Sequence, residues 1–183
     1  MIRVRTNLDD LRTDGYVEFW HVVPENLRLR CIEELNKNPD EFWYWTGPLA
    51  EEFREWFRAF LLRSVSEIFG ESALAVFNRN PGRSMDWHED SSGGDVNYGR
   101  RVFCSVYLTM TTEEQGALRI MPESHRISKA TFDLGQPIDS ETHAMPDGTV
   151  FIGDERLMHS VAENKGPNRR TMVMWWRWIP IEK

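Results

Sequence analysis

Apolar residues recur at helical spacing in three segments of the first part of the chain. In the segment 47–70 they form one stripe that ends before Gly70, and its members are Phe53, Phe57, Phe60, Leu61, Val65 and Ile68. The segment 22–39 starts with Pro24, which suits a first helical turn, and its stripe is Leu27, Ile32 and Leu35. A shorter segment has Thr6 or Asn7 as its N-cap and Gly15 as its stop. These patterns predict three helices.

The pattern changes from about residue 72 onward. Short segments rich in β-branched, aromatic and other apolar residues alternate with clusters of Gly, Pro, Asn and Asp; they span 73–80, 100–110, 116–121, 148–153 and 169–180. No segment of helical spacing and helical length separates them, which favours antiparallel strands over βαβ units. We therefore predict an α+β, mainly β chain whose jelly roll (a double-stranded β-helix, cupin-like) is braced by N-terminal helices.

Composition limits the classes of function. The chain has 183 residues, of which 40% are hydrophobic and 12% aromatic, as expected for one domain over 1–183. We expect its helical part at about 1–70 and its jelly-roll core at about 72–180. The net charge of −7 argues against nucleic acid or an anionic membrane as partner. No apolar run approaches the roughly 18 residues of a membrane span, and the N-terminus is too polar for a signal peptide.

The two cysteines indicate a compartment. Cys31 and Cys104 lie in a predicted helix and a predicted strand, with no Cys-x-x-Cys spacing. We interpret both as small buried hydrophobic residues, with a single disulfide as the alternative. The prediction is a cytoplasmic protein; the sequence does not indicate its oligomeric state.

The stretch "SMDWHEDSSGG" carries the first candidate chemistry. On an extended segment His88 and Asp90 project from the same face, so an imidazole and a carboxylate can bind one metal ion. The alternative for an isolated His-x-Asp is a solvated surface turn. A third ligand has to come from elsewhere, and the candidates are His21, His125, His143 and His159. His159 is best placed, because a predicted strand and a turn lead into it. Two histidines and one carboxylate leave three open positions, as in non-haem Fe(II) oxygenases.

An arginine pair follows His159 at the head of an apolar strand. A guanidinium inside a mostly apolar barrel needs a carboxylate partner, and its planar fork suits the distal carboxylate of a 2-oxo dicarboxylic acid. Arg169 and Thr171 share a strand face, so that a hydroxyl can add a second hydrogen bond. We favour Arg169 on this ground, with Arg170 as the alternative anchor and a solvated strand end as the default interpretation.

Several longer motifs resemble one family. "NPGRSMDWHED", "SVYLTMTTEEQGALRIMPESHR" and "MPDGTVFIGDERLMHSVAENKGPNRRTMVMWW" are similar to segments of the phytanoyl-CoA dioxygenase family of Fe(II)/2-oxoglutarate-dependent oxygenases. The resemblance covers nearly the whole chain. One departure is Glu123, which replaces the glycine of the usual Pro-Gly-Ser-His, so the backbone there has to tolerate a side chain.

The resemblance implies a site. His88, Asp90 and His159 are expected to bind Fe(II) as the catalytic metal, and Arg169 to bind the co-substrate 2-oxoglutarate, with O2 as oxidant. Thr171 and Asn78 are expected to assist at the 2-oxoglutarate site. Further candidates for contact with a small-molecule substrate lie near the metal motif or on the arginine strand, namely Arg79, Tyr98, Arg100 and Trp175.

The expected reaction is hydroxylation of an unactivated C–H bond of a small metabolite or biosynthetic intermediate, with decarboxylation of 2-oxoglutarate to succinate and CO2. Desaturation or oxidative cyclisation at the same site is one alternative. A non-catalytic metal-binding jelly-roll sensor is another. The compact chain argues against a bulky acyl-CoA substrate, and the presence of Asp90 argues against halogenation.

Overall fold

The computed structural model describes residues 8–38, 40, 42–65, 74–79, 81–90, 100–127, 139–166 and 170–179. Within these ranges the helices are α1 (Leu8–Thr13), α2 (Glu25–Leu35), α3 (Pro48–Ser64) and the short 3-10 helix η1 (Ser124–Arg126). The strands are β1 (Tyr16–Phe19), β2 (Phe42–Trp45), β3 (Leu74–Arg79), β4 (Met85–His88), β5 (Arg100–Tyr107), β6 (Leu118–Ile120), β7 (Glu141–His143), β8 (Thr149–Asp154), β9 (His159–Val161) and β10 (Arg170–Ile179).

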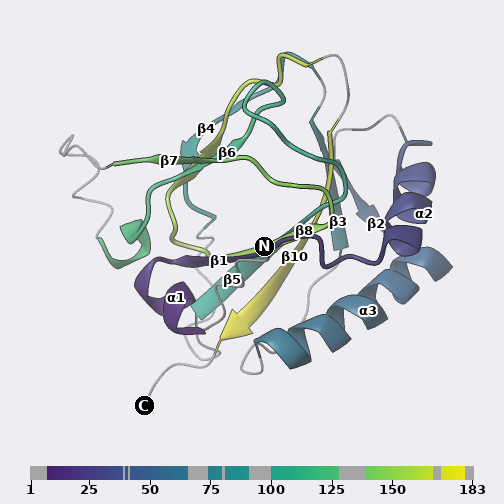
Figure 1. Ribbon diagram of the computed structural model, residues 1–183, viewed down its shortest axis with the longest axis horizontal. Helices are drawn as coiled ribbons and strands as arrows, with labels where there is room; N and C mark the ends of the chain where they lie inside the picture. The colour runs from purple at the N-terminus through teal and green to yellow at the C-terminus, as the bar shows by residue number, and fades with distance from the viewer. Residues whose placement is uncertain are drawn as a thin grey trace.

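The strands form two antiparallel sheets. The larger sheet has the order β1-β8-β5-β10-β3-β2, and the smaller has the order β4-β9-β6-β7. Figure 1 shows the two sheets as the walls of a barrel, with α2 and α3 on the outer side of the larger sheet. The predicted jelly roll with helical bracing is thereby confirmed.

The central strand β5 of the larger sheet is apolar on both faces, because both faces are covered. On β5, Val102, Cys104 and Val106 belong to the core cluster that includes the stripe of α3, in which Phe53 and Phe57 are fully buried. Phe103 and Tyr107 alternate with them and belong to the second cluster, between the two sheets. We call these the helix-facing and barrel-facing sides. Cys31 and Cys104 are buried and form no disulfide with each other.

All five predicted strands are present, and the structure adds short ones. β1 and β2 lie within the part expected to be helical, where they extend the larger sheet by pairing with β8 and β3. The predicted third helix ends earlier than expected, at Ser64; Ile68 and Gly70 lie outside the described residues. Among the described helices, none has the length and hydropathy needed to span a membrane.

The Pro-Glu-Ser-His segment braces the strand that carries His159. The backbone N–H of Met158 donates to Ser124 Oγ at 2.8 Å, and that of Met121 donates to the Met158 carbonyl at 3.0 Å. His125 is buried with its Nε2 3.0 Å from the carbonyl oxygen of Arg12. Glu123 has φ +62°, in the left-handed region, so a side chain occupies a position that favours glycine.

Replacing Glu123 with glycine should therefore stabilise the protein. Relief of the left-handed strain outweighs the greater unfolded-state freedom of glycine by about 0.5–1 kcal/mol, which raises Tm by roughly 1–4 °C for a chain of this size. The exposed ion pair with Arg126, at 3.9 Å, contributes little. Thermal unfolding of E123G against E113G provides the check, since Glu113 is exposed and has a negative φ. A Tm of E123G at or below that of the parent chain would contradict the prediction.

Candidate metal centre

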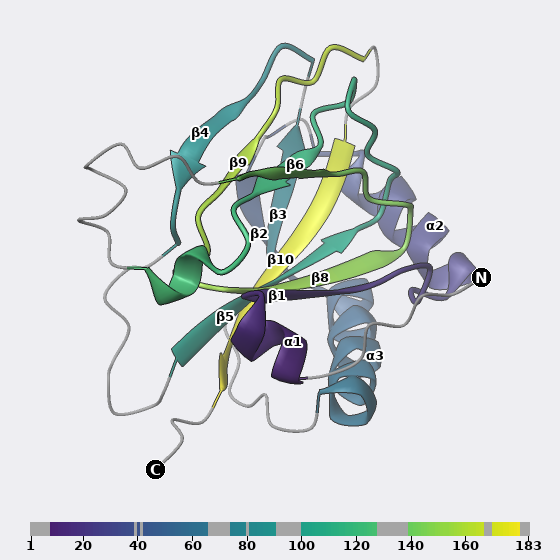
Figure 2. The ribbon, with the colours of Figure 1, turned by 60° about the vertical axis from the view of Figure 1, so that its left-hand side comes forward.

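β4 and β9 bring two of the predicted ligands together. These strands are antiparallel neighbours in the smaller sheet, as Figure 2 shows, and their register pairs His88 directly with His159. Directly opposite residues share a sheet face, so the two imidazoles project to the same side. Their ring centroids are 4.2 Å apart. Two histidines separated by seventy residues of sequence therefore lie side by side at the edge of the barrel.

Asp90 completes a convergent group. Its Oδ1 lies 3.7 Å from His88 Nε2 and 4.0 Å from His159 Nε2. One ligand atom from each of the three residues lies within 4.8 Å of the others, and no second such group of His, Cys, Asp or Glu occurs among the residues that the structure describes. The spacing predicted from His-x-Asp is present in the fold.

Backbone carbonyls orient both imidazoles. His88 Nδ1 lies 2.7 Å from the carbonyl oxygen of Asp86, and His159 Nδ1 lies 2.8 Å from that of Leu157. An imidazole that donates Nδ1–H to a carbonyl carries its lone pair on Nε2. Both Nε2 atoms face Asp90 Oδ1. The local structure thus selects the tautomer that a metal ligand requires.

Burial favours metal-binding protonation states. Burial lowers the pKa of His159, an effect opposed in part by the carboxylate of Asp90 and reinforced by His88. The neutral form of His159 is the form that coordinates a metal. Asp90 Oδ2 is buried and has no hydrogen-bond partner among the described residues. A buried carboxylate oxygen without a partner is costly unless a cation meets it, so this donor set fits a divalent metal.

The centre is open on one side. The side chain of His159 is only 6% exposed, whereas that of His88 is 31% exposed. Behind His159 lies the ring of Phe103, with centroids 4.9 Å apart. Phe103 has room because its cross-strand partner is Gly153, where a Cβ would lie 2.4 Å from Phe103 Cζ. An apolar floor and an approach from the side of His88 suit a site that admits ligands.

Two residues at this site were not predicted. Arg101 donates from Nη2 to the backbone carbonyl of Asp90 at 2.8 Å, and its Nε lies 3.2 Å from Glu155 Oε2. Arg101 follows the predicted candidate Arg100 at the start of β5, and the two positions belong to opposite faces of the strand. Nothing in the sequence links Arg101 to Glu155, because 54 residues separate them.

The register of β10 decides which positions face the barrel. Arg170 pairs with Arg79, and Thr171 pairs with Asn78. Positions 172 and 176 lie opposite the barrel-facing residues Tyr107 and Phe103, so even positions of this strand belong to the barrel side. Odd positions, including 171, lie opposite helix-facing residues such as Val106 and Cys104. Arg170 is thus at a barrel-facing position, and Arg169 lies outside the described residues.

The residues predicted to assist the arginine lie at helix-facing positions. Asn78 is buried on the helix-facing side of β3, where its Nδ2 donates to the Asp40 carbonyl at 2.9 Å. Its ladder partner, position 171, shares that side, and so does position 175, which pairs with Cys104. The physical reason is the phase of the strand: positions 171 and 175 do share a face, but the register makes it the helix-facing one.

The remaining substrate candidates are only partly described. Position 79 belongs to the barrel-facing side of β3, and position 100 pairs with position 179 at the start of β5. Tyr98 lies outside the described residues.

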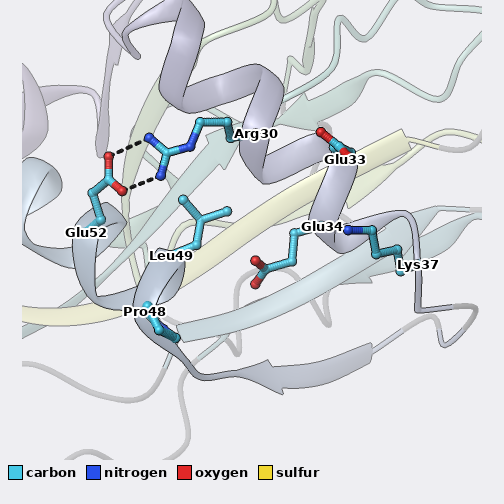
Figure 3. A pocket seen from close by; sticks show the side chains of 7 residues that line it. All are labelled: Arg30, Glu33, Glu34, Lys37, Pro48, Leu49 and Glu52. Atoms are coloured by element: carbon cyan, nitrogen blue, oxygen red, sulfur yellow. Dashed lines mark hydrogen bonds and ion pairs between the residues drawn. The ribbon is translucent and has the colours of Figure 1, made fainter.

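A separate surface pocket lies between α2 and α3. Its volume is about 390 Å³, and Figure 3 shows its charged walls, with Arg30 paired to Glu52 and a hydrophobic side chain, Leu49, between them. The other lining residues are Glu33, Glu34, Lys37 and Pro48. It contains none of the predicted site residues.

Comparisons with known proteins agree with this architecture. The family described as phytanoyl-CoA dioxygenase (PhyH) matches residues 23–172. A comparison with curated protein sequences gave no match.

Among solved structures, HygX from Streptomyces hygroscopicus with nickel and 2-oxoglutarate bound is similar with a TM-score of 0.76 and 15% identity, over 96% of this chain and 87% of that one. The non-heme alpha ketoglutarate dependent epimerase SnoN from nogalamycin biosynthesis is similar with a TM-score of 0.72 and 16% identity, over 93% of this chain and 80% of that one. The carbocyclase SnoK from the same biosynthesis is similar with a TM-score of 0.71 and 15% identity, over 97% of this chain and 85% of that one. At these identities the likeness is one of fold.

Proposed function

Because the chain belongs to the phytanoyl-CoA dioxygenase family, whose enzymes use Fe(II), 2-oxoglutarate and O2, we propose that it hydroxylates an unactivated C–H bond of a small metabolite or biosynthetic intermediate. The observation that carries the proposal is the convergence of His88, Asp90 and His159 within 4.8 Å. Fold and family alone would be compatible with an inactive relative, whereas two oriented imidazoles and a buried carboxylate retain the full donor set.

In this proposal His88 and His159 bind Fe(II) through Nε2, and Asp90 binds it through its carboxylate. When bound, Fe(II) would let the oxidant O2 react with 2-oxoglutarate, which would be decarboxylated to succinate and CO2; one oxygen atom would enter succinate and the other the substrate. The protein's part is geometric and electrostatic. Asp86 and Leu157 carbonyls fix the imidazoles, Phe103 excludes water behind His159, and the exposed side of His88 leaves a route for substrate.

We propose Arg170 as the anchor for the distal carboxylate of 2-oxoglutarate. Support comes from the register: position 170 has the phase of the barrel-facing positions, opposite Arg79 at the start of β10. Arg169 was favoured from the sequence because it shares a strand face with Thr171. The register makes position 171 a helix-facing position. A guanidinium fork inside the barrel matches a carboxylate bidentately, which a lysine at the same position would not do.

A second outcome at the same site is oxidative cyclisation or desaturation. The observation that favours it is that two proteins of similar fold are described as a carbocyclase and an epimerase, so this architecture is compatible with outcomes other than hydroxylation. Product mass separates the outcomes, because hydroxylation adds an oxygen atom whereas cyclisation and desaturation remove two hydrogen atoms.

The test is substrate-stimulated release of succinate. The protein with Fe(II), 2-oxoglutarate and O2 is screened against amino acids, nucleosides and carrier-bound acyl groups, with mass spectrometry of the products. We expect one class to raise succinate release well above the rate without substrate, and to gain one oxygen atom. Substrate oxidation that proceeds without 2-oxoglutarate would contradict the proposal. Binding of metal and 2-oxoglutarate with no turnover for any class would favour the sensor alternative.

We also propose that the chain is a single domain that acts in the cytoplasm on a small molecule. Both cysteines are buried and form no disulfide with each other, which suits a reducing compartment. The net charge of −7 opposes a nucleic-acid partner.

A further inference from the structure

Arg101 links three segments that meet at the metal centre. It lies on β5, two residues before Phe103 and on the same barrel-facing side. Its Nη2 donates to the carbonyl oxygen of Asp90 at 2.8 Å, which fixes the backbone of the residue that supplies the carboxylate. Its Nε lies 3.2 Å from Oε2 of Glu155, in the turn that leads from β8 to the strand of His159. One guanidinium therefore holds the Asp90 segment and the His159 turn together.

Glu155 is bound to Arg101 through the backbone as well. The backbone N–H of Arg101 donates to Glu155 Oε1 at 3.3 Å, and the backbone N–H of Glu155 donates to the Arg101 carbonyl at 3.0 Å. Both side chains are largely buried, with 18% and 11% exposed. The Nε–Oε2 contact is an ion pair without a hydrogen bond. Because both charges are shielded, neither can return to water without opening the fold.

The charges are also arranged for a cation. A bare guanidinium beside Asp90 would repel a divalent metal and weaken its binding. Glu155 neutralises Arg101, so that the carboxylate of Asp90 remains available to the metal. The contact from Arg101 reaches the backbone carbonyl of Asp90 and not its carboxylate, whose Oδ2 is buried without a hydrogen-bond partner among the described residues.

We propose that Arg101 and Glu155 are positioning residues that set the distance between Asp90 and His159 and thereby determine the metal affinity of the triad. The inference rests on the proposed function, because it takes His88, Asp90 and His159 as the metal ligands. Removing a residue that holds a metal ligand in place without binding the metal itself typically weakens metal binding by about 10–100-fold.

The experiment measures Ni²⁺ binding to the metal-free protein by isothermal titration calorimetry, which needs no turnover. R101M and E155Q should weaken Ni²⁺ binding by about 10-fold or more. The Ni²⁺ affinity of R101K should lie between those of R101M and the parent chain. An ammonium keeps the charge, but it lacks the planar fork that contacts both partners. The matched controls R30M and E52Q break the Arg30–Glu52 pair of Figure 3, on α2 and α3, and should leave Ni²⁺ affinity unchanged.

Removing one member of a buried pair leaves the other uncompensated, so R101M could lose affinity by losing stability. The double variant R101M/E155M removes both charges and keeps the volume, which is expected to preserve the thermal unfolding temperature. Its Ni²⁺ affinity should still be at least about 10-fold weaker than that of the parent chain. A double variant that folds and binds Ni²⁺ like the parent chain would overturn the inference. Absence of Ni²⁺ binding by the parent chain would instead overturn the proposed function.

Discussion

The alanine variant of Asp90 should lose metal binding and turnover while its fold persists. Asp90 supplies the only carboxylate of the triad, and its loss leaves two neutral imidazoles for a divalent ion. The affinity should fall by more than the roughly 10–100-fold caused by loss of an outer partner. The metal-free fold should not lose stability, because the variant removes a buried carboxylate oxygen that has no hydrogen-bond partner among the described residues. Its free energy of unfolding should stay within about 0.5 kcal/mol of the parent value or rise.

The checks are Ni²⁺ calorimetry, succinate release and thermal unfolding of D90A. The matched control is D86A, which removes an exposed carboxylate from β4, the strand of His88, while it keeps the backbone carbonyl next to His88 Nδ1. D86A should behave as the parent chain in all three assays. Unfolding of metal-free D90A would point to a structural metal, and unchanged metal affinity would remove Asp90 from the site.

Replacing Arg170 with methionine should weaken 2-oxoglutarate binding and leave the metal in place. Loss of one partner from a shielded, hydrogen-bonded charge pair costs about 2–5 kcal/mol, which corresponds to roughly 30-fold or more in affinity. R170K should retain only part of the 2-oxoglutarate affinity, because an ammonium lacks the planar fork. R169M is the matched control and should bind 2-oxoglutarate as the parent chain does.

The readout is the 2-oxoglutarate dissociation constant of the Ni²⁺-loaded variants, measured beside their Ni²⁺ affinity. If R169M loses 2-oxoglutarate affinity and R170M does not, Arg169 is the anchor and the proposal for Arg170 is wrong. Equal Ni²⁺ affinity in all variants separates this effect from damage to the triad.

The metal group was predictable from sequence because its geometry is local or nearly so. His-x-Asp on an extended segment places two side chains on one face, and this holds for His88 and Asp90 whatever the rest of the fold does. The third ligand followed from a strand and a turn that lead into His159. The long segments 100–110 and 169–180 were equally clear, since their apolar runs exceed what a turn or loop would carry.

The phase of β10 was not predictable, because the strand is apolar on both faces. Met172 and Trp176 occupy one face, and Val173 and Trp175 occupy the other, so hydrophobicity gives no alternation. Strand periodicity states which residues share a face but not which face is inside. Only the pairing with Phe77 and Tyr107 fixes it.

The positioning pair and the short strands escaped prediction for a related reason. Arg101 and Glu155 meet only after β5 and β8 have paired, and each alone resembles an ordinary solvated charge. β7 and β9 have three residues each, too few for a periodic signal, and β2 reads Phe-Trp-Tyr-Trp with aromatic residues on both faces.

The triad and the arginine strand should bind Fe(II) and 2-oxoglutarate together. The most direct measurement is the visible absorption of the parent chain under anaerobic conditions, with Fe(II) and 2-oxoglutarate added singly and together. A weak metal-to-ligand band that appears only with both ligands, and that D90A lacks, is the predicted result. A folded parent chain that shows no such band at saturating Fe(II) and 2-oxoglutarate would contradict the account.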